Sequence, residues 1–171
     1  MGDIQVKWTK SIPSKILCFV WREIQGRIPS AVALKRRGMS DIIITCGACI
    51  NGEEDSDHIL VNCNFSREVI NLILSWCGQN HNSFSTVEEL LHFAGTFGRN
   101  SKDSKRMNII CYGLLWGLWL SRIERLLKAS FTRPHLVADK IKASVYFWVK
   151  HRSKHGVGSW VDWKESPFSV L

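Results

Sequence analysis

The segment CGACINGEEDSDHILVNC, residues 46–63, contains three cysteines and one histidine in the spacing Cys-x2-Cys-x8-His-x4-Cys. Two cysteines separated by two residues can reach one ion from a single turn, and the loop that follows returns the other pair from the far side. Three thiolates and one imidazole close a tetrahedron and leave no open position, which is typical of structural zinc sites. The segment therefore predicts one structural Zn²⁺, bound by Cys46, Cys49, His58 and Cys63.

Two other interpretations of this segment stay open on sequence alone. In the first, the four residues are unrelated: the cysteines are small buried hydrophobic residues, and the histidine is a polar loop residue. In the second, Cys46 and Cys49 form a redox pair, although no βαβ pattern surrounds them.

The remaining cysteines, Cys18, Cys77 and Cys111, fall on or near apolar helical faces, and we expect them to be inert core residues. Cys77 and His81 stand four residues apart and can form half of a second metal site, but no other ligand pair is obvious. Six cysteines in a chain without a visible secretory signal indicate thiols and metal rather than disulfides.

Short helices are predicted on both sides of the metal segment. Pro13 and Ser30 suit helix starts, and Thr86 followed three residues later by Glu89 fits a capping box. The β-branched run 42–45 predicts a short strand or an extended lead into the metal segment. The predicted short helices are residues 13–25, 31–37, 66–77 and 86–97, and residues 98–104 are the best candidate for an internal linker.

Two long helices are predicted in the second half of the chain. Apolar residues recur at steps of three and four over residues 107–127 and again over residues 134–151. Pro134 suits the first turn of the second helix. Trp160 and Trp163 follow in a tail that we expect to be irregular and to fold back onto the helices.

These elements together predict a mainly α fold. We expect a small helical domain with an N-terminal CCHC zinc knuckle, followed by a helical bundle with two long amphipathic helices. The zinc-binding domain is expected at residues 1–78 and the helical C-terminal region at 79–171, packed together as one unit. A chain of 171 residues, 45% hydrophobic and 22% charged, is long enough to bury such a core.

The sequence also argues against several classes of protein. The longest apolar run, residues 109–120, is shorter than the roughly 20 residues that a membrane span needs. Residues 1–15 lack the continuous apolar stretch of a secretory signal, so we expect an intracellular protein of the nucleus or cytoplasm with no membrane partner. No Gly-rich phosphate loop, nucleophile elbow or HExxH motif occurs, so we expect neither an enzyme nor a small-molecule substrate.

Positive charge is concentrated in the C-terminal part. Residues 122–154 carry a net charge of +7, close to the +8 of the whole chain. Such a field attracts phosphate or acidic protein surfaces, and Trp148, Trp160 and Trp163 can supply stacking platforms for nucleic acid. Alternatively, these charges only solvate the outer faces of two amphipathic helices whose tryptophans are core. The candidate partner-binding or nucleic-acid-binding residues are Arg122, Arg125, Lys128, Arg133, Lys140, Lys142, Lys150, Arg152 and Lys154.

Three blocks of sequence resemble a known family. PSKILCFVW at residues 13–21 and RIPSAVALKRRG at residues 27–38, followed by the metal segment, are similar to the zinc-binding domain of plant LINE-type (non-LTR) retrotransposon reverse transcriptases. LWGLWLSRIER at residues 115–125 resembles the Trp- and Arg-containing helix near the end of such reading frames. The resemblance implies the same four zinc ligands, and nothing in the chain matches the polymerase or endonuclease parts.

The resemblance suggests a function without catalysis. Because the chain begins at Met1 just before the domain, we interpret it as a detached tail. We expect a domesticated protein-interaction or regulatory factor, for example a selfish toxin or antidote factor, with a protein partner or with self-association through the helix at residues 107–127. The alternative is a module that binds RNA or single-stranded DNA through its basic C-terminal helices.

Overall fold

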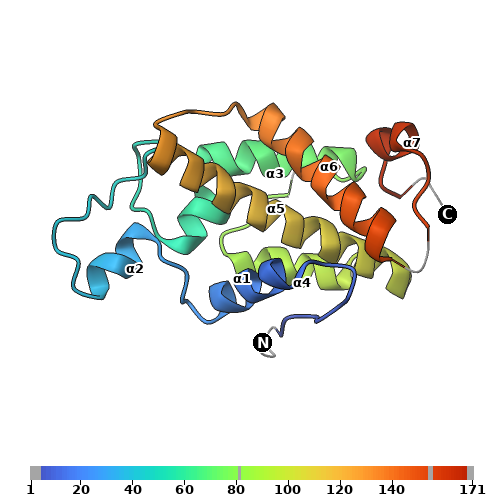
Figure 1. The fold of residues 1–171 in the computed structure, drawn as a ribbon, viewed down its shortest axis with the longest axis horizontal. Coiled ribbons are helices and arrows are strands. Elements are labelled where there is room, and N and C mark those ends of the chain that lie inside the picture. Colours follow the sequence, from blue (N-terminus) through green and yellow to red (C-terminus); the bar gives the residue numbers. More distant parts are fainter. Residues whose placement is uncertain (1–4, 81, 154–155, 169–171) are drawn as a thin grey trace.

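The computed structural model describes residues 5–80, 82–153 and 156–168, and its regular elements in these ranges are helices (Figure 1). In these ranges, β pairing is limited to one isolated antiparallel bridge between Thr45 and Glu53. The predicted mainly α fold is therefore confirmed. The elements are α1 (Ser14–Ile24), α2 (Ala31–Arg36), the π-helix η1 (His58–Asn62), α3 (Asn64–Trp76), α4 (Val87–Thr96), α5 (Ser101–Lys128), α6 (Pro134–Arg152) and α7 (Trp160–Glu165).

The helix α5 begins earlier than its apolar pattern predicts. The Asn100 side chain accepts hydrogen bonds from the backbone N–H groups of Lys102 and Asp103 at 2.9 and 3.0 Å, which caps the helix. A linker was predicted at residues 98–104, but residues 101–104 are helical. The linker prediction is therefore wrong over residues 101–104. The first turn of α5 is polar, so the spacing of apolar residues does not reveal it.

The central element is α5, which contacts α1, α3, α4, α6 and η1. Figure 1 shows it running through the middle of the molecule, beside α6 and α1. Its Gly113 and Gly117 allow α6 to approach closely, because a Cβ atom at either position would clash with Val145 or Ile141. One hydrophobic cluster extends from Ile12 to Trp163. The segments before and after residue 78 therefore share a core.

The C-terminal tail folds back onto the helices, as predicted, but it is not irregular. Ser159 caps α7, its side chain accepting from the Asp162 N–H while the Asp162 carboxylate accepts from the Ser159 N–H. Trp163 is fully buried; its Nε1 donates to the Lys142 carbonyl at 3.0 Å, and its own carbonyl accepts from Trp76 Nε1 at 2.8 Å. These bonds satisfy both indole N–H groups in the interior.

Other sequence predictions have mixed outcomes. Cys77 and Cys111 are buried, as predicted, whereas Cys18 is exposed and its assignment to the core was wrong. His81, the other half of the proposed second metal site, lies outside the described residues. None of the described helices is long and apolar enough to cross a membrane.

Candidate metal centre

The four predicted zinc ligands converge in space. The Sγ atoms of Cys46, Cys49 and Cys63 and a ring nitrogen of His58 all lie within 4.8 Å of one another. Cys46 Sγ is 3.8 Å from Cys63 Sγ, and Cys49 Sγ is 3.2 Å from His58 Nε2. The interpretation as four unrelated residues is therefore wrong. A redox pair is also disfavoured, because the close contacts cross between the two halves of the segment.

These donors fit one zinc ion. Zn–S bonds of about 2.3 Å at tetrahedral angles place two sulfur atoms about 3.8 Å apart, which is the distance observed between Cys46 and Cys63. Three sulfur donors and one imidazole complete the coordination and leave no position for water or substrate. The site therefore suits a structural ion.

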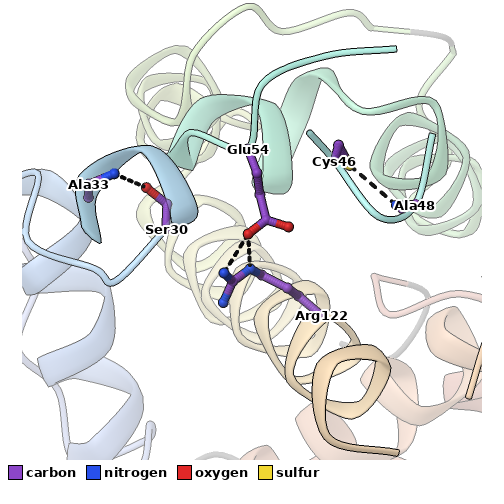
Figure 2. Close-up of polar contacts among 6 residues, drawn as sticks. All are labelled: Ser30, Ala33, Cys46, Ala48, Glu54 and Arg122. Carbon is purple, nitrogen blue, oxygen red and sulfur yellow. Dashed lines mark hydrogen bonds and ion pairs between the residues drawn. The ribbon is translucent and has the colours of Figure 1, made fainter. Parts of the chain in front are cut away.

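A tight turn presents the first two cysteines. The backbone N–H of Cys46 donates to the Gly52 carbonyl at 2.8 Å, and the N–H of Ile50 donates to the Cys46 carbonyl at 3.0 Å. The Ala48 N–H points at Cys46 Sγ, 3.4 Å away, and stabilises negative charge on the sulfur (Figure 2). Closing the turn requires a left-handed backbone at Ile50, with φ 63°.

A π-helical turn presents the other two ligands. The N–H of Cys63 donates to the His58 carbonyl, five residues earlier, at 2.8 Å. In an α-helix with 3.6 residues per turn, residues five apart point about 140° away from each other. The wider turn of η1 brings both side chains to the same side, where they could bind one ion. Asp55 Oδ1 fixes its start by accepting from the His58 N–H at 2.7 Å.

The imidazole of His58 lies directly on Gly52. A Cβ atom at Gly52 would be 2.5 Å from His58 Cε1 and 2.8 Å from Nδ1. Only a residue without a side chain leaves room for the ring in this position. Gly52 is therefore a further requirement of the site, beyond the four ligands.

The contact between Cys46 and Cys63 favours a thiolate on Cys46 and a thiol on Cys63. Hydrogen bonding to Cys63 lowers the pKa of the Cys46 thiol to about 4, while the same contact and burial raise the pKa of Cys63. Without metal, the two sulfurs share a proton, which a zinc ion would displace. Burial lowers the pKa of Arg125, and the nearby Cys46 and Cys63 oppose that shift. The guanidinium of Arg125, 4.8 Å from the centre of the Phe65 ring, thus offsets the excess negative charge of a Cys₃His–zinc site.

A buried ion pair between Glu54 and Arg122 links the metal segment to α5. Arg122 Nε donates to Glu54 Oε1 at 2.8 Å, Nη2 contacts the same oxygen, and both side chains are more than 90% buried (Figure 2). The Arg122 guanidinium also lies 4.8 Å from the centre of the Trp119 ring. Sequence reasoning assigned Arg122 to a binding surface, but the structure places it in the interior. Glu54 was not singled out, because nothing local relates residues so far apart.

The other candidate basic residues are spread over several surfaces. Arg125 and Lys142 are partly buried, and Lys154 lies outside the described residues. Lys140 Nζ is 3.7 Å from Glu124 Oε2, and Lys142 Nζ is 3.9 Å from Asp139 Oδ1. Of the three tryptophans considered for stacking, one is fully buried, one is partly buried and Trp160 is exposed. The exposed basic candidates are Lys128, Arg133, Lys140, Lys150 and Arg152.

Comparison with known proteins finds a match for the N-terminal part. Residues 2–69 match the family described as zinc-binding in reverse transcriptase. The match contains all four residues of the metal cluster, so the resemblance to a reverse-transcriptase zinc-binding domain and the prediction of zinc are confirmed. No curated protein and no solved structure matches the chain.

Proposed function

We propose that this protein is a non-catalytic, zinc-stabilised module whose function is to bind another protein. The observation that carries the proposal is a group of exposed apolar side chains where α5 turns into α6. Leu126, Leu127, Phe131 and Leu136 are 61, 79, 58 and 47% exposed. Adjacent apolar side chains of this size mark interaction surfaces, whereas single exposed ones need no explanation. We call these four residues the hairpin tip.

The hairpin tip contacts α3 directly after the last zinc ligand. The Phe131 ring packs edge-on against Phe65 with the ring centres 5.5 Å apart, and Arg125 lies on the same ring. Phe65 follows the ligand Cys63 by two residues, at the start of α3. Figure 1 shows the metal segment beside the C-terminal end of α5. Zinc would thus fix the position of the surface that a partner meets.

The closed donor set and the family match support a role without chemistry. A Cys₃His site leaves no coordination position for a substrate. The match to a reverse-transcriptase zinc domain supports descent from a retrotransposon tail. We propose a domesticated regulatory factor of the plant nucleus or cytoplasm, for instance a selfish toxin or antidote factor, rather than a working retrotransposon part.

A matched pull-down from plant extract tests this function. The variant Leu127→Asp places a charge on the hairpin tip, and Ile43→Asp places one at an equally exposed position away from it. We expect the wild type and Ile43→Asp to capture the same protein and Leu127→Asp to lose it. Equal capture by all three proteins, or a strictly monomeric wild type in light scattering with no specific partner, would contradict the proposal.

Binding of nucleic acid is the second candidate, favoured by a different surface. At the C-terminal end of α6, Lys150 Nζ lies 5.6 Å from the centre of the Tyr146 ring, and the ring of Trp160 is 5.1 Å from that of Tyr146. Lys150 and Arg152 are exposed beside them. Aromatic rings next to cations are typical of single-strand binding.

Filter binding of single-stranded RNA against salt tests this second function. We expect binding that weakens as salt rises, and a double variant Lys150→Glu, Arg152→Glu that loses it. A charge reversal at Lys35, which is exposed on α2, serves as the control. Absence of wild-type binding at about 50 mM salt would eliminate this function.

A further inference from the structure

A groove runs between α5 and α6 on the face next to α1. Its α5 wall carries Trp116, Leu120 and Glu124 at four-residue steps, and its α6 wall carries Lys140, Ser144 and Trp148 at the same steps. The groove has a volume of about 280 Å³. Four-residue rows are the ridges between which a further helix packs. The floor is formed by Gly113, Gly117, Val137 and Ile141.

The two glycines bring α6 close to α5 at the floor of the groove. Because the glycines have no side chains, Val145 and Ile141 of α6 pack directly on the α5 backbone, and the larger residues at the four-residue steps form walls on either side. Along α5 the wall extends from Trp116 to Leu127, which is about 17 Å or three helical turns. This length suits a segment of about 12 residues in helical form.

Apolar surface follows the same path. Leu120 is 41% exposed in the groove wall. Leu127, seven residues further along α5, and Leu136, four residues before Lys140 on α6, continue the two walls into the hairpin tip. The groove and the tip therefore lie along the same faces of α5 and α6, with the Glu124–Lys140 pair between their apolar side chains, and together they are called the strip.

The charged residues of the strip are lysines, except for Glu124. Lys15 lines the groove with its Nζ 5.6 Å from the centre of the Trp116 ring, and Lys140 stands on the opposite wall. Lys128 follows at the end of α5. The single acid in the lining, Glu124, already faces Lys140 at 3.7 Å. A ligand for this strip needs apolar anchors flanked by negative charge.

We propose that the α5–α6 groove binds an acidic amphipathic helix of a partner protein. The inference rests on the proposed protein-binding function and adds the chemistry and form of the partner. Anchors spaced at three, four and seven residues would meet Trp116, Leu120 and Leu127, while acidic residues beside them would reach Lys15 and Lys140. Complementary charge selects an acidic helix over a basic one and accelerates association.

The test measures fluorescence anisotropy with three labelled synthetic 15-residue peptides. All share leucines at helical i, i+3, i+4, i+7 spacing, and their remaining positions are filled by glutamate with alanine, by glutamine with alanine, or by lysine with alanine. We expect the wild type to bind the glutamate peptide at least tenfold more tightly than the lysine peptide. The charge reversal Lys140→Glu should reduce that ratio.

Two matched variants locate the binding site. Leu120→Glu should weaken binding of the glutamate peptide at least tenfold, whereas Leu72→Glu, at a similarly exposed position on α3, should leave it unchanged. Circular dichroism and zinc content confirm that each variant is folded. Binding that survives Leu120→Glu, or equal binding of all three peptides, overturns the proposal.

Other occupants of the groove give distinct outcomes. Cosedimentation with phosphatidylserine vesicles that Leu120→Glu abolishes would assign the strip to a membrane surface. A dimer in light scattering that Leu120→Glu dissociates would assign it to a second copy. Either result overturns the acidic-helix proposal, as does failure of every peptide to bind. Binding of the glutamine peptide as tightly as the glutamate peptide, with loss in Leu120→Glu, overturns only the acidic character and leaves the protein-binding function standing.

Discussion

Ile50 holds a left-handed backbone conformation, with φ 63°, in the turn that presents Cys46 and Cys49. A β-branched residue is unfavourable there by about 1–2 kcal/mol, and the Ile50 side chain gains little in return because it is exposed. We predict that Ile50→Gly stabilises the zinc-loaded protein by about 1 kcal/mol in urea denaturation, after allowance for the greater flexibility of glycine.

The control for this prediction is Ile43→Gly. Ile43 is equally exposed but does not have a positive φ, so glycine there brings only its entropic cost. Equal losses of stability in both variants would show that Ile50 is not strained.

Glu23 of α1 is buried, and its Oε2 has no hydrogen-bond partner among the residues that the structure describes. Burial raises its pKa from 4.5 to about 7, assisted by the charges of Asp57 and Asp55 and opposed by a hydrogen bond with Ser56. The folded protein therefore retains a proton that the unfolded chain loses between these two values. Stability contributed by Glu23 is complete below pH 4.5 and declines as the pH rises to about 7.

We predict that Glu23→Gln removes this decline. Relative to wild type, the variant should gain about 2 kcal/mol in the free energy of unfolding between pH 5 and pH 7.5, because one pKa unit corresponds to about 1.4 kcal/mol. Urea titrations at fixed zinc concentration measure it, and the comparison cancels the pH dependence of zinc binding that both proteins share. Parallel curves over this range would refute the assignment.

Sequence reasoning succeeds at the residue scale where the chemistry is local. The spacing of Cys46, Cys49, His58 and Cys63 is sufficient to identify the ligands, because each pair lies within one short segment. The pairing of Arg122 with a glutamate 68 residues earlier has no such signal. Charge counting placed this arginine on a surface because it cannot detect a buried partner.

Between elements, the Arg122–Glu54 pair joins the metal segment to α5. Breaking a buried pair leaves an uncompensated charge and typically costs about 3–5 kcal/mol, whereas apolar replacement of both partners is often nearly neutral. We predict that Arg122→Met is strongly destabilising and that the double variant Arg122→Met, Glu54→Met recovers most of the loss. Urea denaturation of the four proteins of this cycle gives the coupling energy; additive losses would contradict the pairing.

Helices with a regular apolar face could be predicted from the sequence. The positions of α5 and α6 follow from their periodicity, but η1 does not, since a π-turn is set by the need for His58 and Cys63 to reach one ion. The start of α7 has a capping signal in the sequence. Ser159 and Asp162 have the spacing of a capping box, but the tryptophans around them suggested an irregular tail.

At the scale of the whole molecule, the zinc segment and the C-terminal helices share one core. Loss of zinc should therefore affect more than the N-terminal third. We predict that chelation increases hydrogen exchange at least tenfold in residues 45–63 and also in residues 122–133, where Arg122 pairs with Glu54 of the metal segment and where Arg125 and Phe131 contact Phe65, two residues after Cys63. Exchange in α7, which contacts α6 and Trp76 rather than the metal segment, serves as the internal reference. Faster exchange confined to residues 45–63 would show that the structure of the hairpin tip does not depend on zinc.

Thermal denaturation with and without a zinc chelator, followed by circular dichroism, tests the central claim most directly. Zinc binding contributes to folding free energy, so we predict that chelation lowers the melting temperature of the wild type by more than about 10 °C. Cys49→Ser should melt at the lower temperature with or without chelator. Cys18→Ser, which removes an exposed cysteine outside the cluster, should respond as the wild type does. An unchanged melting temperature after metal analysis has confirmed zinc removal, or a chelator response that survives in Cys49→Ser, would contradict a structural zinc held by these four residues.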